Sequence, residues 1–133
     1  MESIDYREFS LTAIDHAQRP RNLGPLSNFN AHARVTGPCG DTMEFWLLVM
    51  DGRLEKVSFI TDGCGSSCAC GSMATCLVEG RNLEEAAALD EQDILSALGG
   101  LPEDFLHCAL LAATTLKAAC EDYIHHRHKE AIL

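Results

Sequence analysis

Seven cysteines are the residues of this chain best suited to chemistry, and no export signal accompanies them. In a small secreted protein they would suggest a disulfide framework, but 133 residues that are 47% hydrophobic can bury a core without one. The first residues show neither a secretory nor a transit segment, so we expect a reducing, cytoplasmic location. Metal binding or thiol chemistry is therefore the better prediction for the cysteines.

Cys39 and Asp41 lie in the segment 37–41, where glycine and proline interrupt regular structure. In an extended backbone, residues two apart point to the same side, so the thiolate and the carboxylate can face one ion. A turn in which Asp41 accepts hydrogen bonds from nearby backbone amides explains the same pattern. The sequence leaves both interpretations open.

Cys64 is bracketed by Gly63 and Gly65 at the end of a predicted hairpin and just before a predicted helix. Because an antiparallel hairpin returns the chain to its starting end, Cys64 should lie close to Asp41 and Cys39. The glycines leave backbone N–H groups exposed, and the helix N-terminus adds partial positive charge that favours an anion. A turn would need the glycines but gives no reason for a cysteine between them.

His107 and Cys108 lie near the start of the longest helical pattern, next to the apolar stripe of Leu106, Leu110 and Ala113. The pair does not fit that stripe, so we expect it to project from another face and to complete the site over the end of the sheet. A histidine with a purely structural role is the alternative.

Helical geometry decides which of the remaining cysteines can reach the same site. Cys120 lies about 18 Å along the helix from Cys108, too far to bind the same ion, and is expected in the core. Cys76 is expected to pack on the buried side of its helix. Cys68 and Cys70 point in directions about 200° apart, so at most one can face the site, and Cys68 is the first choice.

The elements that must position these residues follow from hydrophobic periodicity. A helix at 4–18 and a proline-containing loop precede a short strand at 31–35 and a hairpin at 42–62 with an Asp51-Gly52 turn. Helices are then expected at about 66–80, 83–88, 90–99 and 103–128. The order predicts an α+β fold: a small three-stranded antiparallel sheet, helices packed on one face and a long C-terminal helix.

Length and charge restrict the function further. The size predicts one domain spanning residues 1–133. A formal charge of -10 argues against binding nucleic acid, and the longest apolar runs, six residues at 45–50 and 108–113, are too short to cross a membrane.

Three of these segments resemble the signature segments of the U-type iron–sulfur cluster scaffold family, which includes IscU and the N-terminal domain of NifU. They are Gly-Pro-Cys-Gly-Asp at 37–41, Gly-Cys-Gly-Ser at 63–66 and His-Cys-Ala-Leu-Leu-Ala at 107–112. Segments 15–24 and 117–123 are also similar to the family, so the resemblance covers most of the chain.

The resemblance implies a scaffold rather than an enzyme. It would build a labile [2Fe–2S] cluster from Fe²⁺ and the persulfide sulfur of a cysteine desulfurase, and then pass the cluster to apo iron–sulfur proteins. Cys39, Cys64 and Cys108 would bind the cluster, with Asp41 or His107 as the fourth ligand. Cys108 and Cys39 would also accept persulfide sulfur, and Zn²⁺ could occupy the purified apo form.

The chain departs from the family at two places. Segment 101–105 has two acids and no lysine where many members carry Leu-Pro-Pro-Val-Lys, which counts against an Hsp70-type chaperone as partner. Cys68, Cys70 and Cys76 stand where non-thiol residues are usual. Two alternatives remain: a zinc-dependent sulfurtransferase that works with a cysteine desulfurase on the same fold, and a structural zinc-binding adaptor.

Overall fold

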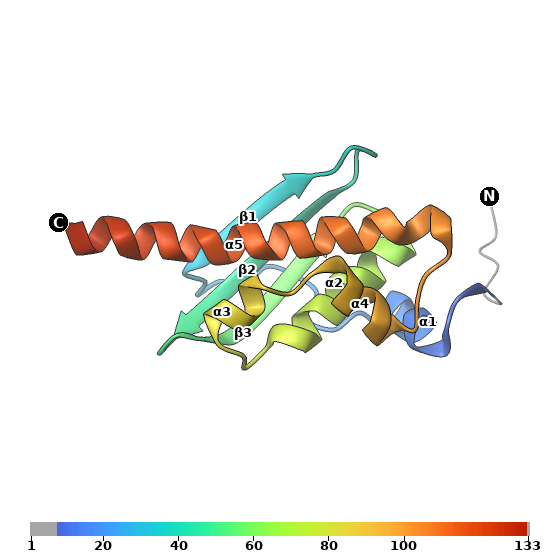
Figure 1. The fold of residues 1–133 in the computed structure, drawn as a ribbon, viewed down its shortest axis with the longest axis horizontal. Coiled ribbons are helices and arrows are strands. Elements are labelled where there is room, and N and C mark those ends of the chain that lie inside the picture. The colour runs from blue at the N-terminus through green and yellow to red at the C-terminus, as the bar shows by residue number, and fades with distance from the viewer. Residues whose placement is uncertain (1–7, 133) are drawn as a thin grey trace.

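The structure, a computed structural model, describes residues 8–132, with side chains from 8 to 126. Its helices and strands follow in the order α1 (Leu11–Gln18), β1 (Ala31–Thr36), β2 (Thr42–Met50), β3 (Arg53–Thr61), α2 (Gly65–Val78), α3 (Leu83–Ala87), α4 (Glu91–Leu98), a short 3-10 turn η2 (Glu103–Phe105) and α5 (Leu106–Ile132) (Figure 1). The predicted strands and the four helices after them are all present. No helix within these residues is long and apolar enough to cross a membrane.

The three strands form one antiparallel sheet in the order β1-β2-β3. The predicted hairpin is confirmed: β2 and β3 are joined at Asp51 and Gly52, whose φ values of 53° and 76° are those of a tight two-residue turn. A register shift between Leu48 and Val49 gives β3 one extra residue, Glu55. The shift lets Leu54 and Val57 both face the core, although they are three residues apart.

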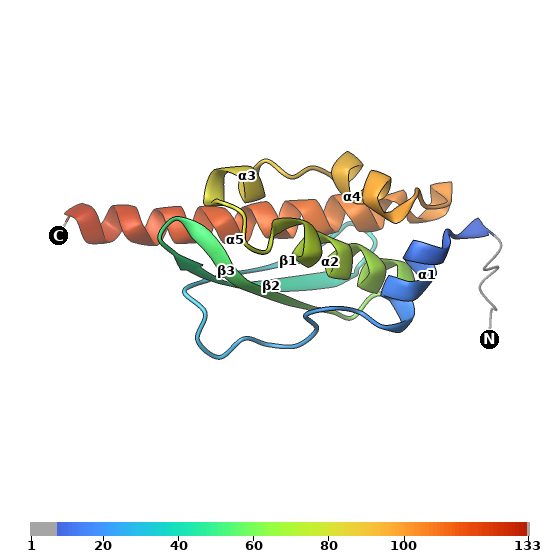
Figure 2. The same cartoon turned by 90° about the horizontal axis from the view of Figure 1, so that it is seen from below.

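Helices cover one face of this sheet, as predicted. Helix α5 packs on β1 and β2, and α2 packs on β3, while α4 lies farther out against α2 and α5, and α3 lies against α5. Figure 2 shows these layers, with the sheet below the helices and the loop between α1 and β1 passing beneath it. The inward side chains Met43, Phe45, Leu47 and Val49 are buried, so alternation along β2 does set the core face.

Helix α2 is buried on most of its surface, which explains its weak amphipathic pattern. It approaches the sheet closely at Gly71, where an added Cβ would lie 2.4 Å from two ring carbons of Phe59. Only a residue without a side chain allows this packing. The helix therefore packs at a short distance from the sheet, and its first turn lies next to the end of β3.

The N-terminal helix is shorter than predicted. It begins at Leu11 because the Ser10 side chain accepts a hydrogen bond from the backbone N–H of Ala13 and caps the helix. Phe9 lies outside the helix and packs against Phe105, with 5.5 Å between ring centroids. Positions 4–7 of the predicted helix lie outside the described residues.

The predicted apolar stripe at the start of α5 is wrong for its two leucines, whereas Ala113 is buried as predicted. Leu106 and Leu110 are 39% and 49% exposed, whereas Cys108 is fully buried. The buried face of the first turns is instead formed by Cys108, Ala109, Leu111 and Ala112. These residues are mostly small, and they face inward because α5 lies against both α2 and the sheet.

Candidate functional site: a cluster of thiols at one end of the sheet

Three segments meet at one end of the sheet: the β1–β2 loop, the residues after β3 and the start of α5. The strand register causes the first two to meet, because Thr36 pairs with Thr42 and Met43 with Thr61. Two hydrogen bonds then fasten Asp62 to Thr42: the Thr42 N–H donates to the Asp62 carboxylate at 2.7 Å and the Asp62 N–H donates to the Thr42 carbonyl at 3.2 Å.

Cys39 lies at the exposed tip of the β1–β2 loop. The loop is a tight turn in which the Gly40 N–H donates to the Gly37 carbonyl at 3.0 Å and the Gly37 N–H donates to the Asp41 carbonyl at 2.8 Å. Gly40 has a φ of +92°, which favours glycine. The turn presents the Cys39 thiol to solvent and directs the half-buried Asp41 toward α2.

Cys64 is the N-cap residue of α2, and its thiol is exposed. Its side chain makes no capping hydrogen bond to the helix backbone, so the sulfur is not held by the helix that it begins. The backbone N–H of Cys68 donates to the Cys64 carbonyl at 3.1 Å, which starts the helical ladder. Cys64 is therefore held through its backbone while its sulfur is accessible.

Cys108, in contrast, lies beneath the surface of the site. The Ser67 hydroxyl donates to its sulfur at 3.4 Å, and the His107 Nε2 atom lies 3.7 Å from the same sulfur. Burial raises the pKa of Cys108 to about 11; the hydrogen bond from Ser67 acts in the opposite direction, and the neighbouring Cys64 and Asp41 add to the increase. In this conformation Cys108 is a neutral thiol at neutral pH.

Ser67 is a site residue that the sequence analysis missed. Its hydroxyl also lies 3.4 Å from Oδ2 of Asp41, so one buried side chain contacts both a predicted thiolate ligand and a predicted carboxylate ligand. The available signal was its spacing, because a residue three positions after Cys64 lies on the same face of the first helical turn. The packing around it is tight: a Cβ at Gly63 would lie 2.5 Å from the Ser67 hydroxyl and 2.9 Å from Oδ2 of Asp41.

The predicted ligands are adjacent but do not form a finished metal site. Asp41 and Cys108 meet through Ser67, Cys64 and His107 contact Cys108, and Cys39 lies with Asp41 and His107 around an apolar hollow of about 300 Å³. Among residues 8–126, no three His, Cys, Asp or Glu side chains are arranged to hold one ion. Thiolate, carboxylate and imidazole are nevertheless the donor types that bind iron in sulfide clusters.

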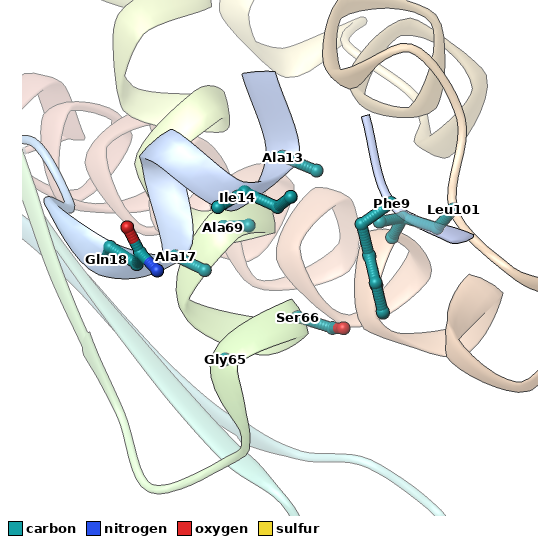
Figure 3. A pocket seen from close by; sticks show the side chains of 9 residues that line it. All are labelled: Phe9, Ala13, Ile14, Ala17, Gln18, Gly65, Ser66, Ala69 and Leu101. Carbon is teal, nitrogen blue, oxygen red and sulfur yellow. The ribbon is translucent and has the colours of Figure 1, made fainter. Parts of the chain in front are cut away.

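A second, apolar hollow lies on the other side of the first turn of α2. Figure 3 shows that Phe9, Ile14 and Ala17 line it from the N-terminal segment and α1, opposite Ser66 of α2. It contains none of the predicted ligands. The thiol cluster is therefore confined to the side of α2 that faces the β1–β2 loop and α5.

The other cysteines are placed as follows. Cys120 is fully buried, which confirms the prediction, and burial raises its pKa to about 12. The prediction for Cys76 is wrong: it is exposed, because position 76 lies on the narrow exposed side of α2. Cys70 is fully buried and Cys68 half-buried, and burial is the main cause that raises the pKa of both.

The fold and the site define a small α+β domain that gathers thiol, carboxylate and imidazole side chains at one end of its sheet. The chain belongs to the family described as the NifU-like N terminal domain, whose model matches residues 8–130. The resemblance seen in the sequence is thereby confirmed.

Relatives and solved structures agree with this assignment. The chain is 38% identical over 122 residues to "Iron-sulfur cluster assembly scaffold protein IscU 1" of Archaeoglobus fulgidus, covering 91% of this chain and 80% of the relative. It is 40% identical over 120 residues to the Escherichia coli K12 protein named "Iron-sulfur cluster assembly scaffold protein IscU", covering 86% and 93%. The crystal structure of a nitrogen-fixing NifU-like protein (N-terminal) from Brucella abortus has the same fold, with a TM-score of 0.70, 18% identity and coverage of 92% and 99%.

Proposed function

We propose that this protein is a scaffold on which an iron–sulfur cluster is assembled and from which it is transferred to apo-proteins. The observation that carries the proposal is the meeting of Asp41 and Cys108 at one buried serine, with Cys64 and His107 next to Cys108 and with Cys39 near Asp41 and His107. Relatives that are 38–40% identical over most of the chain bear the scaffold name, which supports the same role here.

The cluster is cargo, and we propose a [2Fe–2S] cluster bound by Cys39, Cys64 and Cys108. Either Asp41 or His107 would supply the fourth ligand, because each lies next to the thiols from a different segment. A carboxylate or an imidazole is a harder ligand than a thiolate and binds sulfide-bound iron less firmly. One such ligand makes the cluster displaceable, as a scaffold requires.

Sulfur would arrive as a persulfide on a cysteine desulfurase. In this exchange a thiolate of the scaffold attacks the outer persulfide sulfur, and the desulfurase cysteine leaves as a thiolate, so the exchange itself needs no external electrons. Reduction of the transferred sulfur to the sulfide of a cluster then needs an electron donor, such as a thiol or a reduced ferredoxin. The step needs an accessible sulfur. Cys39 meets that requirement in this conformation, whereas Cys108 must first be uncovered.

The partners proposed are therefore a cysteine desulfurase and apo iron–sulfur proteins. An Hsp70-type chaperone is not proposed, because the segment before α5 carries the exposed acids Glu103 and Asp104. Zn²⁺ is proposed as an occupant of the purified apo form, because thiolate sites bind it tightly.

Anaerobic reconstitution tests the function. The protein is mixed with Fe²⁺, cysteine and a desulfurase, and sulfide-to-iron charge transfer is followed by visible absorption. We expect cluster bands in the wild type, their loss in Cys39→Ser, Cys64→Ser and Cys108→Ser, and no change in the control Cys76→Ser, whose exposed thiol belongs to no part of the site. A protein that binds zinc and accepts persulfide sulfur but forms no cluster would instead be a zinc-dependent sulfurtransferase. A domain that only unfolds when zinc is removed would be a structural adaptor.

A further inference from the structure

Ser67 is a buried polar side chain to which the proposed function assigns no task. It is fully buried in the first turn of α2, and its hydroxyl lies 3.4 Å from both Cys108 Sγ and Asp41 Oδ2. A hydroxyl has one proton, so it can donate to only one of them at a time. The distance is ordinary for sulfur, which is a large atom, but long for an oxygen acceptor, where about 2.7–2.8 Å is usual. The hydrogen bond therefore goes to Cys108.

The position of this donor is fixed by its surroundings. Ser67 is part of a helix, and a Cβ on Gly63 would lie 2.5 Å from its hydroxyl oxygen and 2.8 Å from its own Cβ. The backbone of Gly63 thus packs closely against one side of the serine side chain. The hydroxyl is held in place before any ligand arrives.

We propose that Ser67 is a positioning residue that keeps its hydrogen bond to the Cys108 sulfur when this sulfur binds iron, and that it thereby raises the reduction potential of the cluster. The inference rests on the proposed function. A donor to a ligating thiolate withdraws electron density from the sulfur and favours the reduced, more negatively charged cluster. Asp41 is the alternative acceptor, so the same hydroxyl links the thiolate and carboxylate ligands.

The test compares Ser67→Ala with Ser66→Ala, a matched control. Ser66 is also buried in the first turn of α2, but it lines the apolar hollow on the opposite side. In Ser67→Ala we expect a lower reduction potential of the reconstituted cluster, with the reduction equilibrium shifted by up to about tenfold, or about 59 mV for one electron. Ser66→Ala should retain the wild-type potential.

A second measurement does not need the cluster. Apo-protein is loaded with Co²⁺, and the thiolate-to-cobalt charge-transfer band is recorded for the same variants. Loss of the donor raises the energy of the sulfur electrons, so the band of Ser67→Ala should move to lower energy. An unchanged band and an unchanged potential in Ser67→Ala, or equal changes in Ser66→Ala, would overturn the proposal. If the wild type assembles no cluster, the proposed function fails, while the cobalt band still decides whether Ser67 acts on Cys108.

Discussion

Replacing Gly71 by alanine tests the close packing of α2 on β3. The new Cβ would lie 2.4 Å from two carbons of the Phe59 ring, whereas carbon atoms in contact are separated by about 3.5–4.0 Å. The ring cannot move aside easily, because it is fully buried and its centroid lies 6.0 Å from that of Phe45. Such overpacking costs about 1–3 kcal/mol, and the better helix propensity of alanine offsets up to about 1 kcal/mol.

We therefore expect Gly71→Ala to lower the free energy of unfolding by about 1–2 kcal/mol, or Tm by roughly 4–8 °C for a chain of this length. Urea and thermal unfolding, followed by circular dichroism, measure both quantities. Gly65→Ala is the matched control in the same helix, because its Cβ would lie 3.6 Å from that of Ala17, an ordinary contact. Equal stability of the two variants would refute the close approach of α2 to β3.

Three further predictions follow from the site and its surroundings. Asp41→Ala should give a longer-lived cluster and slower transfer to an acceptor, because the hard ligand is lost; an unchanged transfer rate would remove Asp41 from the release step. Cys39, Cys64 and Cys76 should react rapidly with a thiol reagent at pH 7, and Cys108, whose burial raises its pKa to about 11, slowly; peptide mass spectrometry gives the rate of each. Burial lowers the pKa of His16 below its usual 6.5, so the unfolded chain binds more protons and stability should fall as pH decreases from about 7 to 5. Urea unfolding at several pH values measures this slope, which should be smaller in His16→Gln.

The hairpin could be predicted from the sequence because its signals are local. The alternation along β2 and the Asp51-Gly52 pair are signals that span only a few residues, and the structure contains both the strand and the turn that they predict. The hairpin also correctly places Cys64 at the same end of the sheet as Asp41, since antiparallel strands must return. The fold class follows from the same local patterns.

The orientation of α5 could not be predicted in the same way. Apolar periodicity favoured the large side chains Leu106 and Leu110 as the buried face, but helix–helix contact is closest where side chains are small. Ala109 and Ala112 face inward for this reason, and Cys108, which lies on the same side of the helix, is buried together with them. Which face of α5 is buried depends on the elements that pack against it, and the local sequence pattern contains no information about them.

The two errors in α2 have a related cause. A helix buried on most sides has no clear apolar stripe, so its hydrophobic pattern does not indicate the narrow exposed side that carries Cys76. Ser67 was missed because small polar residues carry no periodic signal. Its importance depends on two partners, Asp41 and Cys108, which lie 26 and 41 residues away in the chain.

Cluster transfer is the measurement that tests the central claim most directly. Protein reconstituted anaerobically is mixed with an apo-ferredoxin, and the circular dichroism of the ferredoxin cluster is followed with and without an iron chelator. We expect the cluster to pass to the ferredoxin in a reaction that the chelator does not intercept, and Cys39→Ser, Cys64→Ser and Cys108→Ser each to abolish it. A cluster that never forms, or one that no acceptor can remove, would show that the protein is not a scaffold.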